Sequence, residues 1–394
     1  MDTAVTDEMT LEEYVAHLNG LAFWKEFTFA QNQFAPQPGQ ALELADNLVW
    51  LGGFAIVMQL KQREKPTDDP ETEASWFRKK ILDQGVRQVR DTLRFLAEHD
   101  QISITNEKGH AFHIRGAELT EILKVIVFLP GPALPDALGR KRFHVSRAAG
   151  FIHLIPTHDY LGILETLRVP EDIRRYLAYR QEVAPKIEDP YVEESDIMGA
   201  FLAEQDMPTP NSRQTLGRLV QDLDAFDLSR LIGNLHEHIE TADQPYDYYR
   251  IMLEFARTPR SVWRSVKERF MRSLEVAKAH EFTLPFRLTF PESGCTFMIT
   301  PFHPDVPATG SEGAKARMIG IENLTYAAMY DAGMSKGVGI QVSMDGVYFQ
   351  IDWCLLTIPW ERDAQMDAEL AAGSPFRPAR EKMIHGFFLA DRNE

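Results

Sequence analysis

The stretch ELADNLVWLGGFAIVMQLKQRE, residues 43–64, contains two apolar runs on either side of Gly52-Gly53. Two strand-like runs joined by such a pair of glycines are typical of a β-hairpin. Strand side chains alternate between the two faces, so Gln59 and Lys61 point to the same side. A tight turn would also set Asp46 almost opposite Gln59. The sequence therefore predicts that three polar side chains meet at one end of an otherwise apolar hairpin.

These three side chains are candidate catalytic and metal-binding residues. Asp46 and Gln59 offer oxygen ligands, and the backbone carbonyl of Leu60 offers another. Mg²⁺ or Mn²⁺ binds such oxygens and keeps other positions for water and substrate phosphate. Lys61 would orient or deprotonate the attacking water and offset the charge that builds on the phosphorus. The pattern indicates metal-dependent phosphodiester hydrolysis.

A plainer interpretation fits the same spacing. An acid at this distance ahead of a Gln-x-Lys sequence often arises by chance in a chain of 394 residues. The hairpin would then be buried, with Lys61 to Glu64 opening a solvated loop. Spacing alone favours this interpretation, whereas the strand context and the helix that follows favour a functional site.

That helix, predicted over residues 76–98, has apolar residues at helical spacing and carries concentrated positive charge. Its basic residues include Arg78, Lys79 and, further along, Arg87. They could contact nucleic-acid phosphates. They could equally form a solvated face that pairs locally with Asp83 and Asp91, and the sequence leaves both interpretations open.

The remaining pattern predicts a mixed α/β (α+β) protein of two parts. Helices are expected over residues 9–27 with Thr10 as the N-cap, over 158–183, and over much of 190–280. The last third shows two strand–turn–strand patterns, at Glu292-Ser293-Gly294 and at Asp345-Gly346, with a helical stretch between them. Prolines and acids cluster over 184–195. We therefore predict one domain over residues 1–185 and a helical and antiparallel β module over 186–394.

Composition narrows the classes of protein. The net charge of −16 argues against a protein that coats nucleic acid by charge alone, but leaves room for a local basic groove. Two cysteines exclude a disulfide scaffold and a Cys-rich zinc module. The acidic N-terminus lacks the features of a secretory signal, and no stretch approaches the ~20 apolar residues of a membrane helix. A cytoplasmic protein without a membrane partner is expected.

The histidines give no second candidate site. His236 and His238 are two residues apart on a predicted helix and so lie on different faces, which does not suit a shared metal ion. His153, inside the apolar strand GFIHLIP, is predicted to be a core or cleft residue.

The region from about residue 20 to residue 180 resembles the PD-(D/E)XK nuclease superfamily. In that family a helix precedes a hairpin that bears an Asp and then a Glu, Gln or Ser followed by x-Lys. The likeness is closer to bacterial nuclease-like proteins with a Glu-Leu-x-Asp stretch before an apolar strand that ends in x-x-Lys, here Glu43, Asp46 and Lys61. An aromatic-led basic helix containing a Gln then follows, here Trp76 to Gln88, and residues 150–167 and 174–180 also resemble segments of that group.

The resemblance implies a restriction-endonuclease-like mixed sheet flanked by helices, and cleavage of DNA in preference to RNA with Mg²⁺ or Mn²⁺. It implies that Glu43 is a further ligand of the metal or of water, and that Gln88 holds phosphate or substrate. Gln59 departs from the many members that carry an acid at this position. A neutral side chain lowers the charge of the site and weakens metal binding unless Glu43 compensates.

Degenerate members of this family also exist, which leaves a rival hypothesis. The chain would then be a catalytically inactive nuclease fold that binds nucleic acid or a protein. On either hypothesis the C-terminal half would be an interaction or regulatory module, contacting a protein partner or a second copy of the chain. Nuclease domains joined to such modules are common in bacterial antiviral defence, so the resemblance extends to a defence role.

Overall fold

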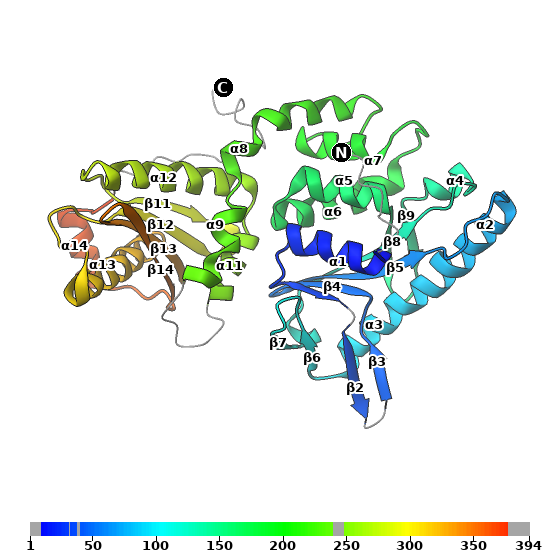
Figure 1. Ribbon diagram of the computed structural model, residues 1–394, viewed down its shortest axis with the longest axis horizontal. Helices are drawn as coiled ribbons and strands as arrows, with labels where there is room; N and C mark the ends of the chain where they lie inside the picture. Colours follow the sequence, from blue (N-terminus) through cyan, green and yellow to red (C-terminus); the bar gives the residue numbers. More distant parts are fainter. Residues whose placement is uncertain (1–8, 31, 38–39, 239–247, 377–394) are drawn as a thin grey trace. The chain divides into compact units, whose positions relative to one another are not determined.

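The computed structural model describes residues 9–30, 32–37, 40–238 and 248–376. The chain divides into two compact units, residues 1–219 and 220–394. A six-stranded sheet lies in the first unit and a four-stranded sheet in the second (Figure 1). Both sheets combine with helices, and this confirms the predicted α/β (α+β) class.

The sheet of the first unit is mixed, and its strands follow the order β1-β4-β5-β8-β10-β9. Strands β1, β4 and β5 are antiparallel, β5, β8 and β10 are parallel, and β9 returns antiparallel to β10. Their bounds are Thr28–Ala30 (β1), Asn47–Leu51 (β4), Phe54–Gln62 (β5), Glu121–Leu129 (β8), Phe143–Ser146 (β9) and Gly150–Pro156 (β10). The predicted hairpin is β4–β5, and it turns at Gly52, whose φ of 67° suits glycine.

One face of this sheet carries α1 (Leu11–Ala22), α5 (Thr157–Leu167) and α6 (Pro170–Val183) (Figure 1). Thr10 caps α1, as predicted, because its hydroxyl accepts from the backbone N–H of Glu13 and the Glu13 carboxylate accepts from the backbone N–H of Thr10. The helical region expected over 158–183 consists of two helices, which are separated at Arg168, where φ is 60°, just before Pro170. The proline cannot continue the hydrogen-bond ladder of α5, so a second helix begins there.

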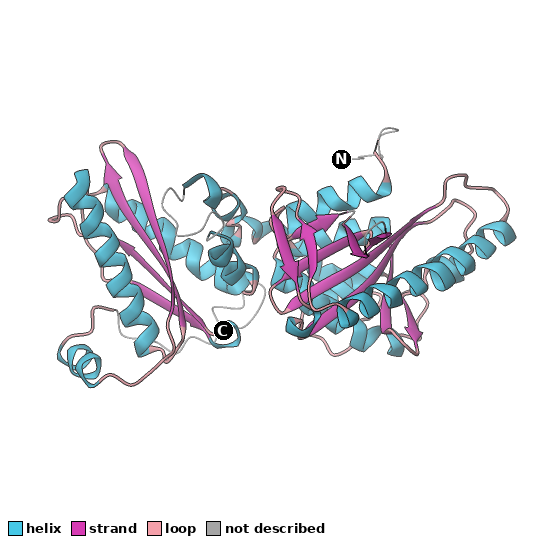
Figure 2. Cartoon of the chain, turned by 90° about the horizontal axis from the view of Figure 1, so that it is seen from below, coloured by secondary structure: helices cyan, strands magenta, loops and turns pink. Residues whose placement is uncertain are grey.

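The other face carries one continuous helical rod over residues 70–98 (Figure 2). It consists of α2 (Pro70–Trp76), a π-helical stretch η1 (Phe77–Gly85) and α3 (Val86–Glu98). The rod starts earlier than the predicted residue 76 because Asp69 accepts from the N–H of Thr72 at 3.0 Å and so caps α2. The apolar side of η1 packs on the sheet, with the ring of Phe77 edge-on to that of Phe128 at 5.4 Å between centroids. Stretches of π-helix are rare and often lie at functional sites.

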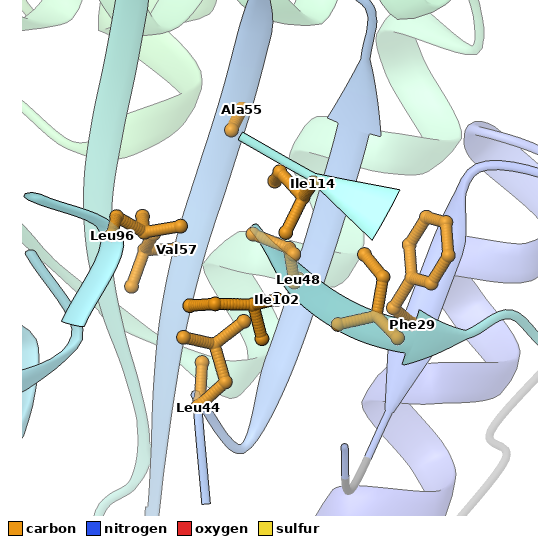
Figure 3. Packing of buried hydrophobic residues seen from close by; sticks show 10 residues of the cluster. Phe29, Leu44, Leu48, Ala55, Val57, Leu96, Ile102 and Ile114 are labelled. Atoms are coloured by element: carbon orange, nitrogen blue, oxygen red, sulfur yellow. The ribbon is translucent and has the colours of Figure 1, made fainter. Parts of the chain in front are cut away.

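A hydrophobic cluster fixes the hairpin against α3 (Figure 3). Leu48 of β4 and Val57 of β5 pack with Leu96 of α3 and with Leu44, which precedes the hairpin. A small hairpin, β6 (Ile102–Thr105) with β7 (Ala111–Ile114), covers the same cluster. Next to it, β2 (Gln33–Gln37) and β3 (Gln40–Glu43) form a separate two-stranded sheet. The position of Asp46 between Leu44 and Leu48 is therefore set by buried packing on both sides.

The first unit extends beyond the predicted boundary at residue 185, because α7 (Glu194–Leu202) packs on α5 and α6. Arg180 of α6 binds both carboxylate oxygens of Glu194, at 2.6 and 3.0 Å, and both side chains are buried. A bidentate ion pair of this kind holds α7 in the first unit. The cluster of prolines and acids over 184–195 is a connection within that unit.

The second unit has three layers, with α12 (Arg260–Lys278) and α13 (Gly310–Asp331) on opposite faces of its sheet (Figure 1). The sheet order is β11-β12-β13-β14, with bounds Phe286–Phe290, Cys295–Pro301, Lys336–Asp345 and Tyr348–Thr357. Both predicted hairpins, β11–β12 and β13–β14, are present. The prediction of an antiparallel β module is wrong for one pair of strands, because β12 and β13 are parallel. Helix α13 makes the crossover that a parallel connection needs.

The other helices are short. In the first unit they are α4 (Asp136–Gly139) and the 3₁₀ turns η2 (Gly116–Glu118) and η3 (Ala184–Lys186), and the 3₁₀ stretch η4 (Ser212–Gln221) spans the division between the units. In the second unit they are α8 (Leu223–Phe226), α9 (Ser229–Gly233), α10 (Leu235–His238), α11 (Tyr248–Ala256), the 3₁₀ turn η5 (Pro291–Ser293) and α14 (Ala364–Ala372). Among the described residues, no helix combines the length and the apolar character that crossing a bilayer requires.

Asp159, on α5 near the ion pair of Arg180 and Glu194, makes stability depend on pH. Burial raises the pKa of Asp159 to about 6, and the charge of Glu194 acts in the same direction. An unfolded aspartate titrates near ~3.9. The folded state therefore retains a proton that the unfolded state has lost, and this contribution to stability disappears as the pH rises through about 6.

We expect Asp159→Asn to remove that dependence. Relative to the unchanged protein, its free energy of unfolding should increase as the pH rises from about 4 to about 7, as measured by urea unfolding at several pH values. Glu165→Gln, at an exposed position of the same helix, is the matched control. An equal gain in both variants would contradict the assignment to Asp159.

Candidate functional site

The structure brings Asp46, Gln59 and Lys61 together at the end of the β4–β5 hairpin. Asn47 pairs with Met58, so Asp46 lies opposite Gln59 as predicted. Oδ2 of Asp46 accepts from the N–H of Leu60 at 2.6 Å and from Nζ of Lys61 at 3.0 Å. The Lys61 ammonium also donates to the carbonyl of Leu60 at 2.9 Å. One carboxylate thus binds both the backbone and the lysine of the second strand.

These polar groups are buried. The exposed fractions are 6% for Asp46, 2% for Gln59 and 9% for Lys61, and exposure begins only at Gln62. The plainer interpretation, in which Lys61 opens a solvated loop, therefore does not describe this strand end. Burying three polar side chains in an apolar hairpin is costly unless they bind one another or a ligand.

Gln88 of α3 reaches the same place. The amide of Gln59 can turn either its nitrogen or its oxygen toward Gln88 and Asp46. With the nitrogen inward it donates to Oε1 of Gln88 at 3.3 Å and to Oδ1 and Oδ2 of Asp46 at 3.2 and 3.3 Å. With the oxygen inward, oxygens of three side chains face one another, and only a cation between them would make that arrangement favourable.

The side-chain oxygens at this site are the type of ligand that a hard cation prefers. Oxygen ligands at right angles in an octahedral Mg²⁺ site lie about 3.0 Å apart, from metal–oxygen distances of ~2.1 Å. The Gln59 amide lies 3.3 Å from Oε1 of Gln88 and 3.2 and 3.3 Å from the two Asp46 oxygens, which is close to this spacing. The charge is low, since Lys61 balances the one buried carboxylate, and the described residues contain no group of three or more His, Cys, Asp or Glu suited to a metal. A cation held by these oxygens would therefore be bound weakly.

Glu43, at the end of β3, adds negative charge near this site. Its pKa is raised by burial first and then by the charges of Asp46 and Glu12, while Lys61 acts in the opposite direction. The structure thus places Glu43 within electrostatic reach of Asp46 and Lys61, although Glu43 itself is an exposed residue. A cation bound at Asp46 would favour the charged form of Glu43.

Helix α3 holds two parts of the site at once. Oγ1 of Thr92 donates to the carbonyl of Leu44 at 2.5 Å and also lies 3.1 Å from the carbonyl of Gln88. Thr92 is one turn from Gln88, so the helix that supplies Gln88 also anchors the chain two residues before Asp46.

A buried polar chain supports the hairpin from the opposite face of the sheet, and sequence reasoning missed it. The Tyr160 hydroxyl donates to Oδ1 of Asn19 at 2.5 Å, and Nδ2 of Asn19 donates to Oδ1 of Asn47 at 2.8 Å. Asn47 directly follows Asp46, and Met58, which also contacts Asn19, directly precedes Gln59. The available signal was Asn47 itself, a polar residue at the start of an otherwise apolar strand.

The basic residues of the rod are exposed. Arg78, Lys79 and Arg87 are at the surface, and none of them hydrogen-bonds or ion-pairs with another residue in the described parts of the chain. The sequence left open the alternative of local ion pairs. The ion pair that Asp91 forms is with Arg94, at 3.3 Å, and not with any of these three residues. These three cations, on the same helical rod as Gln88, are free to meet an anion.

His153 is a core residue. It is fully buried and lies 3.2 Å from the Arg180 guanidinium through Nδ1, and burial lowers its pKa. It lies on the face of the sheet opposite to Gln59, since it pairs with Val125 whereas Gln59 pairs with Ile126.

Comparison of the chain with protein-family models, with curated proteins and with solved structures found no match.

The ion pair between Asp46 and Lys61 should have a measurable coupling energy. Lys61→Met leaves the Asp46 carboxylate buried without its counter-charge, which we expect to cost about 3 kcal/mol of unfolding free energy. Asp46→Asn removes that charge, so the double variant should be more stable than the sum of the single effects by ~1–3 kcal/mol. Urea unfolding measures all four proteins.

Arg94→Met is the matched control, because Arg94 is 53% exposed and pairs with Asp91 at the surface. Its loss should cost less than ~1 kcal/mol. Additive effects of Lys61→Met and Asp46→Asn would show that the two groups do not depend on each other.

Proposed function

We propose that the chain is a metal-dependent phosphodiesterase that cleaves nucleic acid, with DNA preferred to RNA. The observation that carries the proposal is the convergence of Asp46, Gln59, Lys61 and Gln88 at one buried strand end. The order of elements supports it, because a helix, a hairpin bearing Asp and Gln-x-Lys, and a further helix bearing Gln follow one another as in PD-(D/E)XK nucleases.

In this proposal the oxygens of Asp46 and Gln59 and the carbonyl of Leu60 hold the metal, and Glu43 adds charge beside it. When bound, Mg²⁺ would polarise the phosphate and lower the pKa of an attacking water. The chain's own contribution is positional. Asp46 fixes the Lys61 ammonium at 3.0 Å, where it can orient the water and stabilise negative charge that builds on the phosphate.

Gln88 and the basic residues of the rod supply the contacts to substrate. The Gln88 amide reaches Gln59, so it can hydrogen-bond a phosphate oxygen placed next to the metal. Arg78, Lys79 and Arg87 bind phosphates further along the strand. The overall charge of −16 opposes nonspecific attraction, which leaves this local surface to bring the substrate in.

Cleavage assays test the proposal directly. Plasmid DNA, linear DNA and RNA are incubated with the protein and Mg²⁺ or Mn²⁺, beside Lys61→Ala and Asp46→Ala. Each substitution should reduce the cleavage rate by ~100-fold or more, the scale on which preorganised charge stabilises a transition state. Gln59→Glu should lower the Mg²⁺ concentration that gives half-maximal activity, because it adds an anionic ligand.

Arg94→Ala controls for a contaminating nuclease and for general effects of substitution. Robust cleavage that survives in both Lys61→Ala and Asp46→Ala would remove these residues from the active site.

Binding of nucleic acid should depend on the exposed cations of the rod. Arg87→Ala should weaken binding to DNA of any sequence and reduce the slope of log affinity against log salt by about 1, since one phosphate contact is lost. Fluorescence anisotropy at several salt concentrations, in EDTA to prevent cleavage, measures both. Arg94→Ala, which removes a cation already paired with Asp91, should leave the slope unchanged.

A second candidate function is a catalytically inactive protein that binds nucleic acid or a protein partner. The neutral side chain of Gln59 and the balance of Asp46 by Lys61 favour it, because both reduce the attraction for a cation. Calorimetric titration with Mn²⁺ distinguishes the two. Heat of binding that disappears in Asp46→Ala supports the phosphodiesterase, and no binding in the unchanged protein supports the inactive fold.

A further inference from the structure

Strand β14 (Tyr348–Thr357) leaves one edge of the second sheet open. It pairs with β13 over ten successive residues without a bulge, from Tyr348 opposite Asp345 to Thr357 opposite Lys336. In the part of the chain that the structure describes, no strand pairs with its outer side. A long, regular edge presents a row of unpaired backbone donors and acceptors to any further strand.

The other sheet edges in the described residues are short. Strand β1 has three residues, β9 has four, and β11 has five and stops at Pro291. Short edges and prolines are common ways in which proteins prevent unwanted pairing. Strand β14 has neither protection, since it is ten residues long and its sequence YFQIDWCLLT contains no proline. It also contains no lysine or arginine, which protect other edge strands by their charge.

The side chains of β14 are suited to a buried contact. Tyr348 and Phe349 are 76% and 42% exposed, and Ile351, Trp353 and Leu355 are half-buried. The strand's one ionisable acid, Asp352, binds Nε of Arg317 on α13 at 2.8 Å. The edge is therefore apolar and locally neutral, so two copies of it would not repel each other.

We propose that β14 pairs antiparallel with β14 of a second copy of this chain, so that the two four-stranded sheets become one continuous sheet in a homodimer. Antiparallel pairing of a strand with its own copy obeys a two-fold axis, and every favourable contact is made twice. This inference is independent of the proposed enzymatic function.

The layering of the unit favours a second copy over a lone peptide. The half-buried side chains lie on both sides of the strand, with Trp353 opposite Ile340 and Leu356 opposite Gly337. Helix α13 contacts β14 on the face of Leu356, and on the face of Trp353 the ring of Phe255 from α11 lies 6.3 Å from the Trp353 ring, centroid to centroid. A partner with the same three layers would continue the sheet and both helix layers, whereas a single added strand would leave its own outer faces in water.

The surface is large enough for a stable dimer. A strand of ten residues is ~34 Å long. With helix layers about 10 Å from the sheet on each side, the edge measures roughly 700 Å² per copy, or about 1,400 Å² in total. Stable interfaces bury about 1,200–2,000 Å².

The mass of the full chain in solution tests the proposal, by analytical ultracentrifugation over a range of concentrations. The unchanged protein should sediment as a dimer, with twice the chain mass of 45.0 kDa. Ile351→Lys or Leu355→Lys should weaken dimerisation by ~100-fold or more, because symmetry brings each added charge into the interface twice. Tyr348→Lys changes a residue that is already exposed, so it keeps the test valid if the half-buried variants do not fold.

Leu288→Lys places the same charge on β11, the opposite edge of this sheet, and should leave the dimer intact. A monomeric unchanged protein would overturn the proposal. So would a dimer whose dissociation constant is the same in the β14 variants, or one that Leu288→Lys weakens equally.

Discussion

The carboxylate of Asp46 organises the first unit at the point where the hairpin meets the helical rod. It accepts from the backbone N–H of Leu60 and from the ammonium of Lys61, so it fixes both the end of β5 and the charge next to it. Without this carboxylate, the buried Lys61 ammonium would keep the Leu60 carbonyl as its one partner among the residues that the structure describes. Because an unpaired buried charge is costly, the local fold and the chemistry of the site depend on the same oxygen atoms.

Two buried systems hold that carboxylate from opposite faces of the sheet. On one face, α3 fixes the backbone ahead of Asp46 through Thr92 and brings Gln88 to Gln59. On the other, Tyr160 and Asn19 form a hydrogen-bonded chain to Asn47. A site supported in this way can keep its geometry before a ligand arrives, which is the condition under which charged groups contribute most to catalysis.

The hairpin and its polar end could be predicted from the sequence because they rest on local rules. Gly52-Gly53 marked the turn, and alternation along the strand placed Gln59 and Lys61 on one face. The approach of Gln88 came only from family resemblance, because its distance from Gln59 depends on how the rod lies on the sheet. Asn19 and Tyr160 were missed since their contacts join segments far apart in sequence. The parallel pairing of β12 with β13 was missed because turn residues predict which two strands form a hairpin. They do not predict how one hairpin pairs with another.

The segment of α3 that joins the π-helical stretch to Gln88 limits how this molecule tolerates insertions and deletions. In an α-helix each residue turns the chain by about 100°, so losing Val86 or Arg87 would rotate everything that follows. Phe77 would stay against Phe128, but Gln88 and Thr92 would turn away from Gln59 and Leu44. The helix could remain intact while the site lost the contacts that Gln88 and Thr92 make. Helix length between these two anchor points is therefore as specific a requirement as the identity of Gln88.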